Sequence, residues 1–227
     1  MKGTLKFVVA LAVTFLVMLA FRALAFTIYT VPSSGLQPEL KEGDRILVNR
    51  WSYGLRTGLG GLFSYGRWCK SKIDYNDMVA FNEPLDTADD VTYRPVCLGY
   101  CKAVPGDTVS VNKDVQIVIP GKCRMVRVTK ENMALLCNTY NIHEHRKAQI
   151  KGDTLYVDGK ITHCASFTQN YYWMTTHSNH NLKDSRFFGL VPENHIIGKV
   201  VTVVFNKDDR KPFYEGYRND RFFASIK

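Results

Sequence analysis

The N-terminal stretch of residues 7–28 constrains this chain more than any other part of its 227 residues. It reads FVVALAVTFLVMLAFRALAFTI and carries a single charge, that of Arg22. As an α-helix, a stretch of this length spans about 33 Å, which matches the hydrocarbon core of a bilayer. Arg22 lies near one end, where its side chain can reach the interface, so the apolar side chains outweigh its cost. The stretch therefore predicts one N-terminal transmembrane helix.

The charges that precede this helix predict its orientation. Lys2 and Lys6 come before the apolar run, and the positive-inside rule places such residues in the cytoplasm. The rest of the chain then lies outside the cytoplasm, with residues 1–29 as a retained membrane anchor. The sequence leaves a second interpretation open, in which residues 23–25 are the small-x-small cleavage site of a removed signal peptide. Arg22, directly before that site, counts against removal.

Composition excludes several classes of protein. Hydrophobic residues make up 45% of the chain and charged residues 22%, which is typical of a globular protein and not of a disordered one. The net charge of +9 suits nucleic acid or anionic lipid, and the predicted export favours membrane lipid and no nucleic acid. The six cysteines include no C-x-x-C pair, which argues against a zinc ribbon or a thioredoxin-type site, and we predict no metal ion and no cofactor. Two alternatives stay open: a zinc site at residues 143–145 and a disulfide between Cys123 and Cys137.

The body of the chain after Thr30 has the pattern of an antiparallel β protein. Short runs of β-branched and aromatic residues alternate with turn residues, and no long segment has helical periodicity. The pair Asp158-Gly159 is the strongest hairpin signal, because a two-residue turn of this type matches the twist of its flanking strands. We predict strands at 45–50, 77–82, 96–104, 108–111, 115–119, 124–129, 154–157, 171–175 and 196–205.

The distribution of irregular sequence predicts four parts in the chain. Residues 1–29 form the membrane anchor. Residues 30–111 and 166–206 together form a β core. Residues 112–165 hold most of the irregular sequence, so we expect an inserted β subdomain there. Residues 207–227 form a C-terminal tail after the core.

Residues 46–73 combine aromatic and basic side chains and contain no Asp or Glu. This composition fits an interfacial belt in which residues such as Trp51 and Trp68 rest on anionic lipid headgroups. A glycine-rich hairpin whose aromatic side chains pack into the core fits the same composition. Both interpretations stay open from the sequence.

Four motif segments follow one another in order behind the apolar stretch. They are Pro-Ser-Ser-Gly-Leu-Gln-Pro at 32–38 with Gly-Asp-Arg-Ile-Leu-Val at 43–48, Asn-Asp-Met-Val-Ala-Phe at 76–81, Cys-Lys-Ala-Val-Pro-Gly-Asp at 101–107, and Asp-Ser-Arg-Phe-Phe-Gly at 184–189 with His-Ile-Ile-Gly-Lys-Val at 195–200. This succession resembles bacterial type I signal peptidases of the kind seen in Bacteroidetes. The tail Arg-Asn-Asp-Arg-Phe-Phe at 218–223 looks like the ending of the same group, so the resemblance covers nearly the whole chain.

The resemblance implies a mainly β, antiparallel signal-peptidase-like fold with one N-terminal transmembrane helix. It implies a single-pass protein of the inner (cytoplasmic) membrane whose C-terminal, peptidase-like β core is periplasmic. The implied activity is that of a membrane-bound serine endopeptidase that removes signal peptides from exported proteins. The implied partners are the signal peptides of exported preproteins and membrane lipid.

The positions of the family's catalytic Ser/Lys dyad both match glycine in this chain. The family pattern Pro-Ser-x-Ser-Met-x-Pro, laid without gaps, puts the nucleophile at Gly35, and the lysine six residues before the Pro of Pro-Gly-Asp falls at Gly99. A serine hydroxyl needs an adjacent base, and a second serine can donate to the oxyanion. We therefore predict Ser34 as a displaced nucleophile, Lys102 as the base and Ser33 as the oxyanion donor.

The offset of Lys102 from the family position sets a geometric condition. Lys102 lies three residues beyond Gly99 and would face the opposite side of a regular strand, so it reaches the site only through a β-bulge. The alternative function is a catalytically inactive protein that binds extended peptides or a partner without cutting. Asp184 and Arg186 are retained from the family pattern, and we predict that they support a loop as a buried ion pair.

Overall fold

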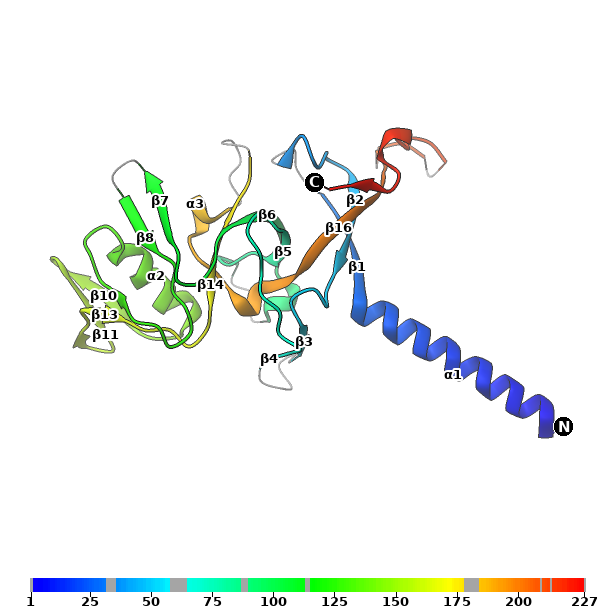
Figure 1. Ribbon diagram of the computed structural model, residues 1–227, viewed down its shortest axis with the longest axis horizontal. Helices are drawn as coiled ribbons and strands as arrows, with labels where there is room; N and C mark the ends of the chain where they lie inside the picture. The colour runs from blue at the N-terminus through cyan, green and yellow to red at the C-terminus, as the bar shows by residue number, and fades with distance from the viewer. Residues whose placement is uncertain are drawn as a thin grey trace.

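The computed structural model describes residues 2–31, 36–57, 65–86, 90–112, 115–177, 184–208, 210–212 and 214–226. Over these residues the fold is mainly β, and the strands of the main sheet pair antiparallel, which confirms the predicted class (Figure 1). The nine strands predicted from the sequence all appear, with ends shifted by a few residues at most.

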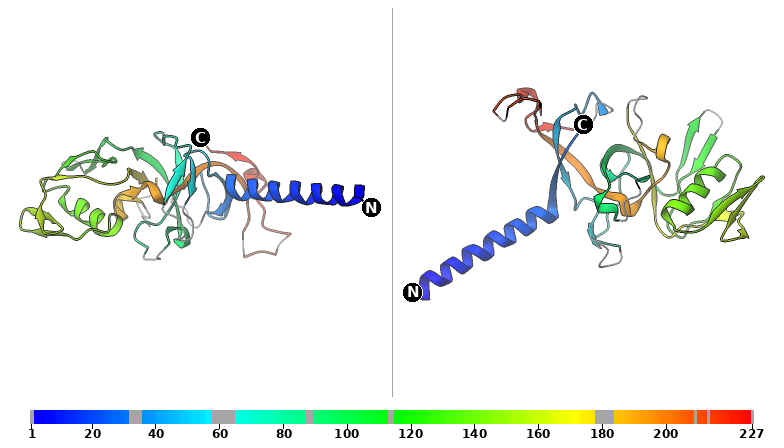
Figure 2. Two further views of the ribbon diagram at one scale, coloured as in Figure 1. Left: turned by 90° about the horizontal axis from the view of Figure 1, so that it is seen from below. Right: turned by 180° about the vertical axis from the view of Figure 1, so that it is seen from behind.

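The N-terminal helix α1 (Lys2–Ala25) projects away from the strands (Figures 1 and 2). Every side chain over residues 3–19 is exposed, and most of them are large and apolar. Within the described part of the chain, no helix combines the length and the hydropathy expected of a membrane span. The apolar segment predicted as one helix over 7–28 changes to a strand at its end, because β1 (Phe26–Thr30) follows Ala25 directly.

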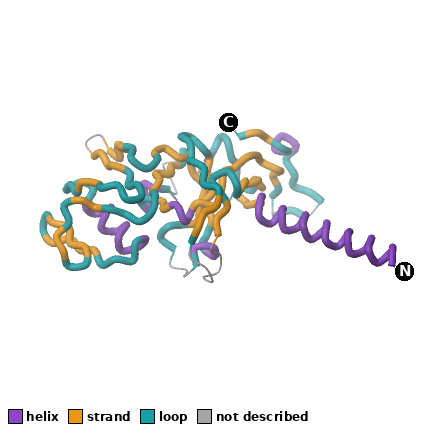
Figure 3. Tube along the Cα trace, turned by 60° about the horizontal axis from the view of Figure 1, so that its bottom comes forward, coloured by secondary structure: helices purple, strands orange, loops and turns teal. Residues whose placement is uncertain are grey.

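One antiparallel sheet forms the centre of the molecule, seen as the orange strands in the middle of Figure 3. Its order is β1-β2-β16-β5-β6-β14-β15, and β17 pairs with β16. The members after β1 are β2 (Asp44–Asn49), β5 (Met78–Asn82), β6 (Val96–Ala103), β14 (Tyr171–Thr175), β15 (Val191–Pro192), β16 (Ile196–Asn206) and β17 (Ala224–Ser225). Strands that are neighbours in this sheet are distant in the sequence, so the sheet brings the motif segments together.

Alternation along β5 and β6 produces two apolar clusters on opposite faces of the sheet, because successive side chains of a strand point to opposite sides. The first, called here the Tyr100 cluster, contains Val31, Leu36, Leu40, Met78, Ala80, Leu98 and Tyr100. The second, called here the Phe81 cluster, contains Val79, Phe81, Cys97, Cys101 and Met174. Val31 and Leu36, the described residues on either side of residues 32–35, both lie in the Tyr100 cluster.

Smaller sheets lie at the end of the molecule opposite α1 (Figure 1). They are built from β7 (Thr108–Asn112), β8 (Val115–Val118), β9 (Val126–Arg127), β10 (Ala148–Lys151), β11 (Thr154–Val157), β12 (Lys160–Ile161) and β13 (Cys164–Ala165). The predicted hairpin at Asp158-Gly159 is confirmed: β11 and β12 pair on either side of it, and φ is +50° and +79° at its two residues. Positive φ at both positions is the requirement of the type I′ turn.

Helix α2 (Met133–His143) contradicts the expectation that no segment after Thr30 has helical periodicity. Its buried face includes Met133, Leu136, Cys137 and Tyr140, which repeat at the three- and four-residue spacing of a helix. Three polar residues with low helix propensity interrupt this pattern in the sequence, and packing against the neighbouring strands outweighs that propensity.

Two open alternatives of the sequence are not realised in the structure. At residues 143–145, His143 ends α2 and its ring lies 5.4 Å from the ring of His195, and among the described residues no group of three or more His, Cys, Asp or Glu side chains is placed to hold a metal ion. The six cysteines are free thiols, so Cys123 and Cys137 form no disulfide.

Some aromatic residues of the stretch 46–73 pack into the core, and others are exposed as an interfacial belt would require. Tyr53 is buried in the core, whereas Trp51 and Trp68 are 48% and 75% exposed. The strands β3 (Leu55–Thr57) and β4 (Gly66–Trp68) pair in a two-stranded ribbon, in which Trp68 is the last residue of β4 and lies opposite Leu55. Among the described aromatic residues of the stretch, Trp51 and Trp68, together with Tyr65 at 40% exposed, remain available to an interface.

Candidate functional site

The predicted nucleophile loop begins and ends at the Tyr100 cluster. Ser33 and Ser34 lie outside the described residues, so their roles stay predictions. Val31 before them and Leu36 after them are both buried in the cluster that contains Tyr100. The polar groups around Tyr100 are therefore the ones that a peptide bound beside this loop would meet.

Lys102 lies on the Tyr100 face of β6. The pairing of β6 with β14 shifts register next to Lys102, but Lys102 still lies on the side of the strand opposite to Gly99, so this bulge does not bring it to the position of the family's lysine. The Lys102 Nζ lies 5.9 Å from the centroid of the Tyr100 ring and donates a hydrogen bond of 2.7 Å to Oδ1 of Asn76. Its side chain is exposed, whereas a lysine that acts as a base requires burial. Lys102 is thus close to the cluster without the environment of a lysine base.

Gly99, which matches the family's lysine, faces the Phe81 cluster. A Cβ at this position would lie 3.3 Å from Cβ of Met174, 3.3 Å from the carbonyl oxygen of Thr175 and 3.5 Å from the Phe81 ring. The buried strands β5 and β14 flank this glycine on either side. Neighbouring atoms fill the space around this position, so a larger residue than glycine would have to displace them. Gly35, the other dyad match, lies outside the described residues.

Asp184 and Arg186 form an ion pair that holds the chain after β14; we call it the Arg186 clamp. Asp184 is fully buried and caps the short helix α3 (Ser185–Phe188) by accepting from the Arg186 amide at 2.9 Å. The Arg186 Nη2 donates to Oδ2 of Asp184 at 2.6 Å and to the carbonyl oxygen of Thr176 at 3.1 Å. The Thr176 amide donates back to Asp184 at 3.0 Å. The clamp therefore fixes the backbone immediately before His177.

The electrostatics of the Arg186 clamp keep its carboxylate charged. Burial by itself would raise the pKa of Asp184. The hydrogen bonds from the Arg186 side chain, from the Thr176 amide and from the Arg186 amide oppose that effect and hold the pKa of Asp184 below its usual range. The pair is thus a fixed structural charge.

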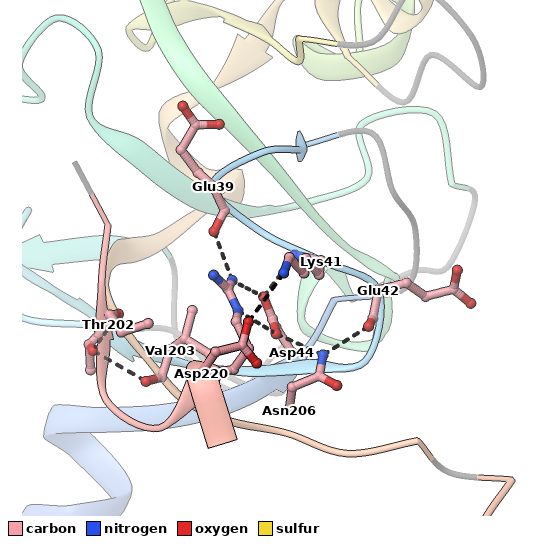
Figure 4. A network of polar contacts seen from close by, with 10 residues as sticks. Glu39, Lys41, Glu42, Asp44, Thr202, Val203, Asn206 and Asp220 are labelled. Atoms are coloured by element: carbon pink, nitrogen blue, oxygen red, sulfur yellow. Dashed lines mark hydrogen bonds and ion pairs between the residues drawn. The ribbon is translucent and has the colours of Figure 1, made fainter. Parts of the chain in front are cut away.

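A second ion pair, the Arg221 clamp, holds the segment after the nucleophile loop (Figure 4). Arg221 donates from Nη2 to the fully buried carboxylate of Asp44, and from the same atom to the carbonyl oxygen of Glu39 at 2.8 Å. Asp44 also accepts from the side-chain amide of Asn206 at 2.8 Å and from the Lys41 amide at 2.8 Å. The C-terminal tail thereby braces the backbone of Glu39. The sequence indicated the tail as a family feature without assigning it this contact.

Glu39, Tyr100 and His177 meet between the two clamps. The His177 Nε2 lies 3.5 Å from Oε2 of Glu39, and the His177 ring lies 4.8 Å from the Tyr100 ring. The Tyr100 hydroxyl and Oε2 of Glu39 are both buried. Burial, followed by the nearby Glu39 carboxylate, raises the pKa of Tyr100 to about 12. The phenol therefore stays protonated at neutral pH.

The chemical capacity of this group is proton transfer and hydrogen bonding to a peptide. A histidine beside a carboxylate can accept and return a proton, and a neutral phenol can donate to an oxygen. No spacing rule links Glu39, Tyr100 and His177, because they come from three separate segments. A long-range contact of this kind is not visible in one sequence, which is why the sequence argument missed it.

Comparisons with known proteins show which family the sequence of this chain resembles. The sequence profile of the family described as signal peptidase, peptidase S26, matches residues 4–205. The chain is 26% identical over 201 residues to signal peptidase IB of Staphylococcus aureus, which covers 88% of each chain. It is 22% identical over 215 residues to signal peptidase I of Pseudomonas aeruginosa, covering 86% of this chain and 70% of that protein.

Proposed function

The chain belongs to the signal peptidase S26 family, and on this premise we propose that it is a membrane-anchored serine endopeptidase that removes signal peptides from exported proteins. The observation that carries the proposal is the meeting of both ends of the predicted nucleophile loop with the polar group around Tyr100. In the proposed reaction Ser34 attacks the scissile carbonyl and Ser33 donates to the oxyanion. The substrate binds as an extended strand, so that main-chain hydrogen bonds hold it and small pockets select its side chains.

The location that we propose is the inner membrane, with α1 as a single-pass anchor and the remaining chain in the periplasm. Large apolar side chains are exposed all along residues 3–19, and exposure of so much apolar surface to water is unfavourable. The removed-signal-peptide interpretation remains the alternative. Trp51 and Trp68 would rest on the same lipid surface.

The anchor is tested by charging its apolar surface. Leu11→Asp with Phe15→Asp places two carboxylates in the middle of α1, each costing roughly 2.5–3.5 kcal/mol in a bilayer. We expect the variant to move from the membrane pellet to the supernatant after carbonate extraction, whereas Ser110→Ala, on an exposed position of β7, stays in the pellet. A double-aspartate variant that remains in the pellet would argue against insertion of α1.

Processing of a preprotein tests the activity. Purified full-length protein should shorten a model preprotein at its signal peptide, and Ser34→Ala should abolish this cleavage because the nucleophilic hydroxyl is removed. Ser110→Ala is the matched control on a distant strand and should cleave at the wild-type rate. Mass spectrometry of the product reports the cleaved bond. Cleavage that survives Ser34→Ala removes this serine from the mechanism.

The second candidate function is a peptide-binding protein that does not cut. It is favoured by Gly99, which fills the place of the family's lysine, and by Lys102, which is exposed and bonded to Asn76. In this case the wild-type protein binds a signal peptide, as measured by crosslinking, and leaves it intact. Turnover by the wild type excludes this candidate.

A further inference from the structure

Two arginines face each other across the ribbon of β3 and β4. Arg56 of β3 lies directly opposite Arg67 of β4 in the antiparallel register, and both residues are half-buried. Like charges directly opposite in a strand pair are destabilising, and a cation that is removed from water is costly unless an anion compensates it. Neither strand contains an acidic residue, so the ribbon concentrates positive charge that its own strands do not neutralise.

The contacts of Arg56 leave much of its guanidinium open. Among the described residues it donates only from Nη1, to Oδ1 of Asn82 at 3.0 Å and to the carbonyl oxygen of Asn194 at 3.1 Å. Both acceptors are neutral, and Nε and Nη2 remain available to a further acceptor. Burial, followed by the nearby cations Arg67 and Arg50, lowers the pKa of Arg56. The direction of this effect indicates that the surroundings of Arg56 are short of negative charge.

Arg67 is bonded to neutral groups as well. Its side chain donates to the carbonyl oxygen of Ile196 at 2.6 Å, to that of Glu193 at 3.1 Å and to the Tyr65 hydroxyl at 3.1 Å. The Glu193 carboxylate accepts from Lys70 at 2.8 Å instead. The segment that connects the two strands contains no Asp or Glu. Arg67 is therefore a fixed cation whose charge is not cancelled by a direct ion pair within the described chain.

The ribbon lies beside the end of α1 (Figures 1 and 2). The Arg50 amide donates to the carbonyl oxygen of Ala25, the last residue of α1, at 2.9 Å. A turn then leads into β3, with the Gly54 amide donating to the carbonyl oxygen of the exposed Trp51 at 3.0 Å. With α1 embedded as we propose, this turn lies at the level of the lipid headgroups, where tryptophan is enriched and lipid phosphates supply negative charge.

We propose that Arg56, supported by Arg67, binds a phosphate group, and that a phospholipid headgroup supplies it. Arginine suits this ligand because its planar guanidinium offers paired donors that match two phosphate oxygens. The bound phosphate places a negative charge beside two cations that lack one. Free phosphate offers the same chemistry and is the alternative source. The inference goes beyond the peptidase, because it does not depend on cleavage and uses the proposed anchor only to name the source of the phosphate.

Thermal unfolding of the full-length protein in detergent micelles tests the site. At constant ionic strength, dioleoylphosphatidylglycerol should raise the unfolding temperature of the wild type, because a ligand that binds the folded state stabilises it. Dioleoylglycerol, which has the same acyl chains and no phosphate, should not. Arg56→Gln should bind the phospholipid at least about 10-fold more weakly, because the open donors are lost. Its unfolding temperature without lipid should change little, since relief of the repulsion from Arg67 offsets the lost hydrogen bonds to neutral groups.

Two further variants separate the site from charge in general. Arg127→Gln is the matched control, because it removes the same charge from an exposed position of β9, at the end of the molecule opposite α1 (Figure 1). This control should bind the phospholipid as the wild type does. Arg56→Lys keeps the charge and loses the paired donors, so it should bind with an affinity between those of the wild type and Arg56→Gln.

The outcomes decide both the site and the source. An equal lipid effect in the wild type and Arg56→Gln, or no effect of any phosphate compound, overturns the site. An effect of inorganic phosphate that Arg56→Gln abolishes, without an effect of the phospholipid, upholds the phosphate site and overturns the lipid as its source. Should Arg56→Gln fail to fold, an affinity of Arg56→Lys equal to that of the wild type overturns the assignment. Each result stands whether or not the protein cuts preproteins, so failure here is distinct from failure of the proposed peptidase.

Discussion

Replacing Arg221 with methionine will lower the free energy of unfolding by about 3–5 kcal/mol. Methionine retains most of the side-chain length but removes the guanidinium, and the Asp44 carboxylate is then buried without its cation. Desolvation of an uncompensated charge is the largest penalty that a single substitution can impose in this part of the fold. Denaturant unfolding, followed by tryptophan fluorescence, gives the difference in free energy.

The control for this substitution lies in the same tail. Arg218 is exposed and three residues away, so Arg218→Met should change the free energy of unfolding by no more than about 0.5 kcal/mol. Arg221→Met should also reduce preprotein cleavage at temperatures where the protein is folded, because the backbone of Glu39 loses its brace. A loss of stability below about 1 kcal/mol would show that the buried carboxylate is compensated by Asn206 and Lys41 alone.

Restoring the family's lysine by Gly99→Lys will also destabilise the protein, by about 3–5 kcal/mol, and will not raise its activity. A side chain at position 99 enters the Phe81 cluster, where Met174 and the Thr175 carbonyl already lie 3.3 Å from the first carbon. The longer chain and its charge would have to displace buried apolar groups. Thermal unfolding and the cleavage assay measure the two effects on one preparation.

A smaller residue at the same position distinguishes packing from charge. Gly99→Ala adds only the first carbon, and its neighbours need to yield by a few tenths of an ångström, so we expect a loss of about 1 kcal/mol. If Gly99→Lys were instead stable and more active than the wild type, this position would be open to the site and not to the core.

The strands were predictable because period-two alternation is a local property of the sequence. Ile46 and Val48 of β2 alternate with partly exposed residues, and the Asp158-Gly159 turn fixes its hairpin by local conformation alone. Helix α2 was missed because its buried residues stabilise it only after they pack against β10 and β11, a contact that no window of the sequence contains. The start of β1 was missed because Phe26–Thr30 continues the apolar composition of the helix before it.

The candidate site was predictable in its motifs and not in its contacts. The retained Asp184 and Arg186 led to the expectation of a supporting ion pair, and the condition that Lys102 needs an irregular strand followed from its odd offset. The meeting of Glu39 with His177 depends on the tertiary positions of two clamps. Spacing in one sequence carries no information on such a contact.

The direct passage from α1 to β1 has a mechanical consequence. Ala25 ends the helix, Phe26 begins the strand, and the Arg50 amide bonds to the Ala25 carbonyl at 2.9 Å, so the joint is tied to the neighbouring strand as well. A linker of glycine or serine would allow the body to swivel, and none intervenes here. With α1 embedded as we propose, the body is held at one height and one tilt above the lipid. The helix would then set the distance from the membrane at which a polypeptide can be cut.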